Sequence, residues 1–84
     1  MAAYTLTKHA AKMLAEREIQ QDWLEHTLNE PLLRQPDPDD ATLERRYRRI
    51  PKCGGRVLRV VVNPVVEPVR VVSVFFDRSM KGKL

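Results

Sequence analysis

The chain has 84 residues, with 15 Lys and Arg against 11 Asp and Glu and a formal net charge of +4. This length fits one domain spanning residues 1–84, and the basic balance is compatible with a nucleic-acid partner. The single cysteine, Cys53, excludes an intrachain disulfide, and no His or second Cys stands at metal-ligand spacing from it. We therefore expect neither a metal nor a cofactor. The apolar runs are too short to span a membrane and no secretory segment follows Met1, so we predict a cytoplasmic protein.

Two helices are predicted over residues 7–30. The first runs from about residue 7 to residue 17, with Thr5 or Thr7 as its N-cap, because apolar side chains recur there at helical spacing. The second runs from about residue 20 to residue 30, where Pro31 ends it, because the residue before a proline disfavours helical backbone. The junction at residues 18–21 leaves two arrangements open, a hairpin of two helices or one kinked helix.

Residues 31–42 contain three prolines and three aspartates and are predicted to form a loop. Strands follow at residues 43–50, 56–63 and 69–76, and the last two are rich in Val, whose β-branched side chain favours a sheet. Residues 51–55, PKCGG, make a hairpin connection, residues 63–68, NPVVEP, make a longer one, and residues 77–84 form a tail. The predicted fold class is α+β: two N-terminal helices packed on a three- to four-stranded antiparallel sheet, with Tyr4–Leu6 as the extra strand.

The two connections suggest a register for the sheet. Centring the first turn on Cys53 places Tyr47 opposite Arg59, and centring the second near Val66 places Arg59 opposite Ser73. Alternation then assigns to the helices the face that carries Leu58, Val60, Val62, Val72, Val74 and Phe76. The second face carries Arg45, Tyr47, Arg49, Val57, Arg59, Val61, Val71, Ser73 and Phe75. Because two helices cover only one side of such a sheet, the second face is expected to meet a partner or a second copy of the chain.

Three ionisable side chains on or beside the apolar stripe of the first helix form a candidate catalytic group: His9, Lys12 and Arg17. Arg17 and Lys12 would hold an anion, and His9, whose pKa is ordinarily near neutral, would move a proton. The alternative is structural. In it His9 is an exposed first-turn residue, Lys12 pairs with Glu16, and Arg17 braces the loop through an aspartate.

The arginine-rich strands carry the candidate nucleic-acid-binding residues Arg45, Tyr47, Arg49 and Arg59. The arginines would follow a phosphate backbone, and Tyr47 would stack on a base. The alternative is a solvated edge strand that its charges protect against aggregation. His26 is predicted to be a surface residue and Trp23 a core residue.

Residues 9–19, HAAKMLAEREI, resemble the signature H-A-x-x-R-M-x-x-R-x-I of a bacterial family of small domains of unknown function. At this spacing the direct matches are His9, Ala10, Arg17 and Ile19, while Met13 and Leu14 stand at the positions of the signature's Arg and Met. Lys12 stands one residue before the position of the signature's Arg, so a positive charge is kept nearby but the bidentate fork is lost. Glu18 replaces a frequent Gly, so no break in the backbone is expected there. The strand with YRR, the Gly-containing turn and the Val-rich final hairpin follow in the family's order.

This family is similar to the RelE, ParE and BrnT toxins, which belong to a wider set of metal-independent ribonucleases and inhibitors. The resemblance implies a toxin-like RNA-binding domain that acts as an endoribonuclease. A 2′-hydroxyl would attack the adjacent phosphate, His9 would move a proton, and Arg17, Lys12 and the sheet arginines would stabilise the phosphorane. The alternative is a non-enzymatic interaction module that binds an antitoxin-like protein or forms a homodimer through the second sheet face. A third possibility is a relic domain that has no activity of its own.

Overall fold

The computed structural model describes residues 3–84, in which one strand is followed by two helices and then by four strands. The elements in chain order are β1 (Tyr4–Leu6), α1 (Lys8–Glu16), α2 (Gln21–Asn29), β2 (Leu33–Pro36), β3 (Glu44–Ile50), the short 3₁₀ turn η1 (Pro51–Cys53), β4 (Arg56–Asn63), β5 (Val69–Phe76) and a second such turn, η2 (Arg78–Met80). The strands form one sheet in the order β1-β5-β4-β3-β2. No helix among these residues is both long and apolar enough to cross a membrane.

The predicted sheet of three or four antiparallel strands is wrong, because the sheet has five strands and is mixed. β1 lies before both helices and pairs in parallel with β5, from Tyr4 opposite Val69 to Leu6 opposite Val71. β2 lies inside the predicted 31–42 loop and pairs antiparallel with β3. Its proline, Pro36, is tolerated because β2 is an edge strand, where one side of the backbone needs no partner in the sheet. Long-range pairing with β3 thus outweighs the local loop signals.

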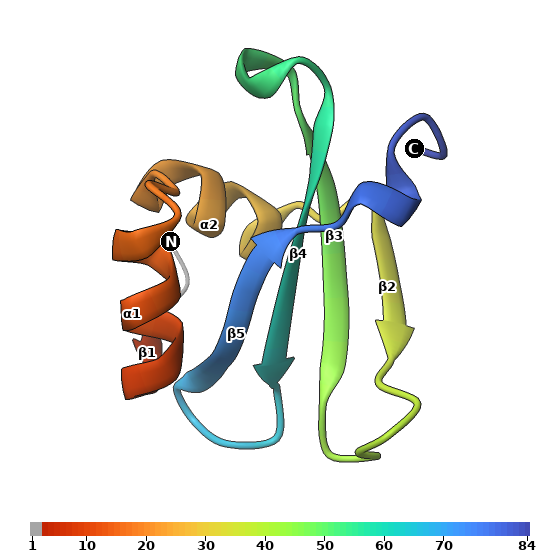
Figure 1. The fold of residues 1–84 in the computed structure, drawn as a ribbon. Helices are drawn as coiled ribbons and strands as arrows, with labels where there is room; N and C mark the ends of the chain where they lie inside the picture. Colours follow the sequence, from red (N-terminus) through yellow and green to blue (C-terminus); the bar gives the residue numbers. More distant parts are fainter. Residues whose placement is uncertain (1–2) are drawn as a thin grey trace.

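The two helices are separate and cover one face of the sheet (Figure 1). α1 begins at its N-cap Thr7, whose hydroxyl accepts a hydrogen bond from the Ala10 N–H at 3.1 Å. α1 packs on β5, whereas α2 packs on β3 and β4. Between them Glu18 has a φ of 52°, so the backbone breaks at the position where no break was predicted. Ile19 after it is buried in the core.

The core lies between the helices and the central strands. Its buried members from the helical segment are Ala10, Ile19, Leu24 and Leu28, and those from the sheet are Ile50, Leu58, Val60, Val62, Val71 and Val74. Tyr47 does lie opposite Arg59, as predicted. Arg59, however, lies opposite Phe75 and not Ser73, and the register shifts between Val61 and Val62. This bulge places Val71 in the core, where alternation had placed Val72.

The second face of the sheet is not open. Tyr47, Val57 and Val61 on this face are all buried. After β5 the chain turns back across the sheet (Figure 1), and η2 packs against β4. The N–H of Asp77 donates to the Val57 carbonyl oxygen at 2.8 Å. Part of the predicted tail therefore packs over this face near Val57, which is buried, whereas Phe75 on the same face is only partly buried.

Candidate functional site

The predicted catalytic group lies on the exposed side of α1 and at its end. His9, Lys12 and Arg17 are all exposed. The Lys12 ammonium lies 3.9 Å from the Glu16 carboxylate, as the structural alternative predicted. Arg17 is the C-cap residue of α1, and the eight-residue separation places it roughly 12 Å from His9 along the helix axis. The loop carboxylate Asp37 pairs with Arg45, at 3.2 Å, and not with Arg17.

Most of the predicted nucleic-acid-binding residues have partners within the fold. Tyr47 is only 2% exposed, so its ring is not available to stack on a base. Arg45 pairs with Asp37. Arg59 lies 3.4 Å from the Asp77 carboxylate, and its guanidinium lies 4.2 Å from the centre of the Phe75 ring. Of the four predicted residues, Arg49 alone is exposed.

Ion pairing and hydrogen bonding also change the pKa of Asp77. Burial alone would raise the pKa of this carboxyl, but hydrogen bonds from Ser79 and the charges of Arg59 and Arg45 lower it below its ordinary value. The lowered pKa keeps Asp77 negatively charged, so that it can pair with the guanidinium of Arg59. Arg59 and Asp77 thus form a partly buried ion pair that joins the end of β5 to β4.

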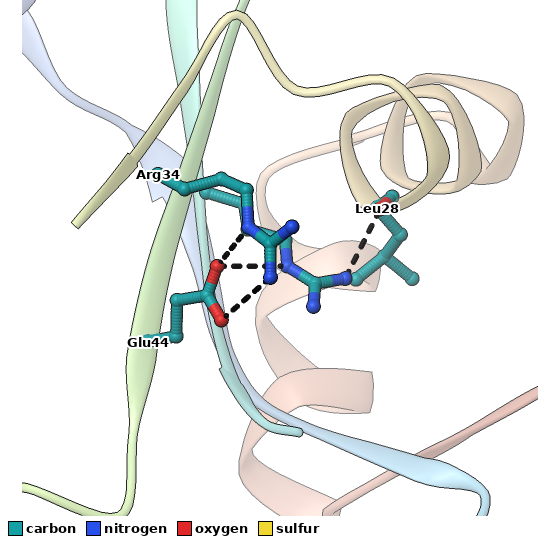
Figure 2. Close-up of polar contacts among 4 residues, drawn as sticks. Leu28, Arg34 and Glu44 are labelled. Atoms are coloured by element: carbon teal, nitrogen blue, oxygen red, sulfur yellow. Dashed lines mark hydrogen bonds and ion pairs between the residues drawn. The ribbon is translucent and has the colours of Figure 1, made fainter. Parts of the chain in front are cut away.

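A second polar cluster joins the edge strand to the helices (Figure 2). The Arg34 guanidinium on β2 donates to both carboxylate oxygens of Glu44 on β3. Arg46 donates to Glu44 at 3.4 Å and to the Leu28 carbonyl oxygen at the end of α2 at 3.1 Å. The hydrogen bond from Arg34 first, and then the charges of Arg46 and Arg34, lower the pKa of Glu44 despite its partial burial. Arg46 is thus a structural residue of the arginine run.

Arg48, Arg49 and the aromatic side chain of Trp23 line an open pocket of about 440 Å³ between α2 and the end of β3. Its polar and aromatic lining comes from α2, β3 and η1: Asp22, Trp23, His26, Arg48, Arg49 and Lys52. Trp23 and His26 are three residues apart, so they share one face of α2. Trp23 packs partly against the core and also lines the pocket.

The turn between β3 and β4 places Lys52 at this pocket. Pro51 opens η1, and Gly54 and Gly55 follow with φ values of 68° and 78°, which favour glycine because a side chain strains this conformation. Arg48 is oriented by donating to the Glu30 carbonyl oxygen at 2.6 Å. The His26 Nε2 atom lies 3.3 Å from a Glu30 carboxylate oxygen. The pocket therefore combines three cations, a partly exposed indole and a histidine beside a carboxylate.

Sequence reasoning missed this pocket. It assigned His26 to the surface and Trp23 to the core, and it named neither Arg48 nor Lys52 as a site residue. In the sequence, the only local feature that pointed to this pocket was the spacing of Trp23 and His26, which places both side chains on one face of a helix. Within residues 3–84, no group of three or more His, Cys, Asp or Glu side chains is placed to hold a metal ion.

Comparison with known proteins gives one match. No curated protein and no solved structure was found to match the chain. The model of a family described as a domain of unknown function, DUF4258, matches residues 6–76. The matched stretch runs from the end of β1 to the end of β5 and includes every residue that lines the pocket. The chain therefore belongs to the DUF4258 family of domains of unknown function.

Proposed function

We propose that this chain is a toxin-like domain, related to the RelE, ParE and BrnT group, that binds single-stranded RNA in the cytoplasm. The observation that carries the proposal is the pocket that Arg48, Arg49 and Lys52 line together with Trp23. Cationic side chains bind the phosphate backbone whatever the sequence. An aromatic face beside them stacks on an unpaired base. Trp23 takes the role that the sequence suggested for Tyr47.

RNA cleavage without a metal is a second candidate function, and His26 favours it. In this reaction His26 accepts the proton of a ribose 2′-hydroxyl, whose oxygen attacks the adjacent phosphorus. The bond from phosphorus to the 5′-oxygen breaks, and a proton returned by His26 completes the new 5′-hydroxyl. The other product carries a 2′,3′-cyclic phosphate. Arg48, Arg49 and Lys52 stabilise the added negative charge of the phosphorane, and Glu30 orients the imidazole.

Binding is tested with a fluorescently labelled single-stranded RNA, by anisotropy over a range of salt concentrations. The test variant is Arg49→Gln with Lys52→Gln, since both side chains are exposed. The matched control is Lys8→Gln with Arg70→Gln, which removes the same charge from exposed residues near the Val69 end of β5. For single strands each lost phosphate contact lowers the slope of log K against log salt by about 0.7, so the test variant should lose about 1.4. If the salt slope falls equally in both variants, positive charge attracts the RNA non-specifically. That result would contradict RNA binding at the pocket.

Cleavage is tested by incubating the same RNA with the protein in EDTA, and the chain's two histidines provide the comparison. We expect His26→Ala to abolish product formation and His9→Ala to leave it unchanged. The reverse result would return the proton-transfer role to α1. A folded protein that binds RNA without cutting it would reject the enzyme and keep the binding function. A folded protein without affinity for RNA would leave the interaction module, with an antitoxin-like protein or a second copy as partner.

A further inference from the structure

A second cationic pocket, of about 370 Å³, lies where β5 ends. Arg56 from β4, Phe76 from β5, and Arg78 and Lys81 after it line this pocket, together with Asp77. The Arg56 guanidinium lies over the Phe76 ring, 4.1 Å from its centre. The carboxylate of Asp77 already accepts hydrogen bonds from Ser79 and pairs with Arg59. The exposed Arg78 and Lys81 therefore give this pocket a positive character.

The two pockets adjoin through aromatic side chains. Trp23 of the first pocket and Phe76 of the second form an edge contact, with ring centres 6.2 Å apart and planes at 63°. The backbone also connects them, because Ile50 at the first pocket lies opposite Arg56 at the second. The β3–β4 turn and the end of β5 lie toward the same end of the sheet (Figure 1). Residues of this turn line the first pocket, and residues at and after the end of β5 line the second.

The distance between the two pockets determines how long a ligand must be to occupy both. The first pocket is lined by residues of β3, and the second by Arg56 of β4, Phe76 of β5 and the residues that follow β5. Neighbouring strands lie about 4.8 Å apart, so the backbones of β3 and β5 are about 10 Å apart. The two pockets share no lining residue, so we expect each to hold a phosphate group of its own. A chain of several nucleotides can place one phosphate in each pocket and its unpaired bases near the Trp23 and Phe76 rings.

We infer that the two pockets form one continuous track for a single-stranded RNA of several nucleotides, in which Arg78 and Lys81 bind a second phosphate. This inference rests on the proposed function and extends it, because it makes ligand length a property of the site. It also gives the C-terminal segment a role in binding besides that of covering the sheet. A dinucleotide has one phosphodiester and occupies only one of the two pockets, whereas a hexanucleotide spans both.

The test measures binding of a dinucleotide and a hexanucleotide to the full chain carrying Arg78→Gln with Lys81→Gln. The single tryptophan, Trp23, reports occupancy of the first pocket by its fluorescence. We expect hexanucleotide binding to weaken and its salt slope to fall by about 1.4, from two lost contacts at about 0.7 each. Dinucleotide binding, which Trp23 fluorescence reports at the first pocket, should remain as in the unmodified chain. The control is again Lys8→Gln with Arg70→Gln.

The contrary outcomes are distinct. If the variant binds the hexanucleotide as the control does, the track is overturned and the first pocket stands alone. If the unmodified chain binds neither ligand, the proposed function fails and the track fails with it. If both ligands weaken equally, Arg78 and Lys81 act as general charge, and the inference of a second phosphate position is overturned. Circular dichroism of each variant confirms that it is folded.

Discussion

The arginine side chains differ in whether they are free to bind a ligand. The difference follows from whether a carboxylate lies within ion-pairing distance. Arg45 faces Asp37, Arg46 faces Glu44, and each pair includes a carboxylate whose side chain is less than one-fifth exposed. Such arginines hold strands together because their removal would leave a poorly solvated anion. Arg49 is exposed at the pocket. The single run RRYRR therefore supplies structural residues in its first half, Arg45 and Arg46, and pocket residues in its second half, Arg48 and Arg49.

At the residue scale, Glu44→Gln should change the dependence of stability on pH. Hydrogen bonding from Arg34, with the charges of Arg46 and Arg34, lowers the pKa of Glu44 in the folded state below its ordinary value of 4.5. A lowered folded pKa stabilises the fold above the unfolded value, and this stabilisation disappears as the pH falls through the folded pKa. The free energy of unfolding from urea titrations should therefore fall below pH 4.5, and less steeply in Glu44→Gln than in the unmodified chain.

The matched control for this prediction is Glu67→Gln, at an exposed position between β4 and β5. It should follow the unmodified chain at every pH. Part of the acid sensitivity should persist in Glu44→Gln, because Asp37, Asp40 and Asp77 also have lowered pKa values. Identical pH profiles for the two variants would show that Arg34 and Arg46 contribute no net stabilisation through Glu44.

At the element scale, the junction of α1 and α2 depends on a residue that is poorly suited to it. Glu18 has a φ of 52°, in the left-handed region that glycine adopts readily and other residues adopt at a cost of about 1 kcal/mol or more. Replacement by glycine removes this strain but raises the entropy of the unfolded chain. We expect Glu18→Gly to increase the free energy of unfolding by about 0.5–1 kcal/mol, measured by urea denaturation.

The control for the junction is Ala15→Gly, in the last turn of α1, where helical backbone is required. This change should decrease the free energy of unfolding by up to about 1 kcal/mol, because glycine is a poor helix former. If both glycine variants lose stability, the left-handed conformation at Glu18 is not a source of strain.

Strands that a local sequence pattern specifies were predictable from the sequence. A strand that forms only by pairing with a neighbouring strand was not. β4 and β5 cover the same residues as the predicted strands, because their Val-rich sequences favour a sheet wherever they pack. β2 has four residues, one of them Pro36, and forms only because β3 offers an edge. The bulge at Val61 is likewise absent from any alternating pattern. The pocket depends on such long-range placement, since α2 must pack on β3 before His26 can meet Arg48.

At the scale of the whole molecule, the C-terminal segment closes the second face of the sheet. Its attachment depends on Asp77, which pairs with Arg59 and caps η2 by accepting from the Ser79 N–H. The side chains of Arg59 and Asp77 are only 19% and 11% exposed, and the Nε atom of Arg59 is buried without a hydrogen-bond partner. Loss of the Asp77 charge would therefore leave a guanidinium largely removed from water.

A double-mutant cycle measures what this attachment contributes. Asp77→Asn keeps an oxygen for Ser79 but removes the charge facing Arg59, so the free energy of unfolding should fall by about 1–3 kcal/mol. In the Arg59→Leu background the same change should cost less than about 0.5 kcal/mol, because no buried cation is left unpaired. The difference between the two costs, from urea denaturation, is the coupling between the C-terminal segment and β4. Equal costs would mean that the ion pair between Arg59 and Asp77 does not contribute to holding the C-terminal segment on β4.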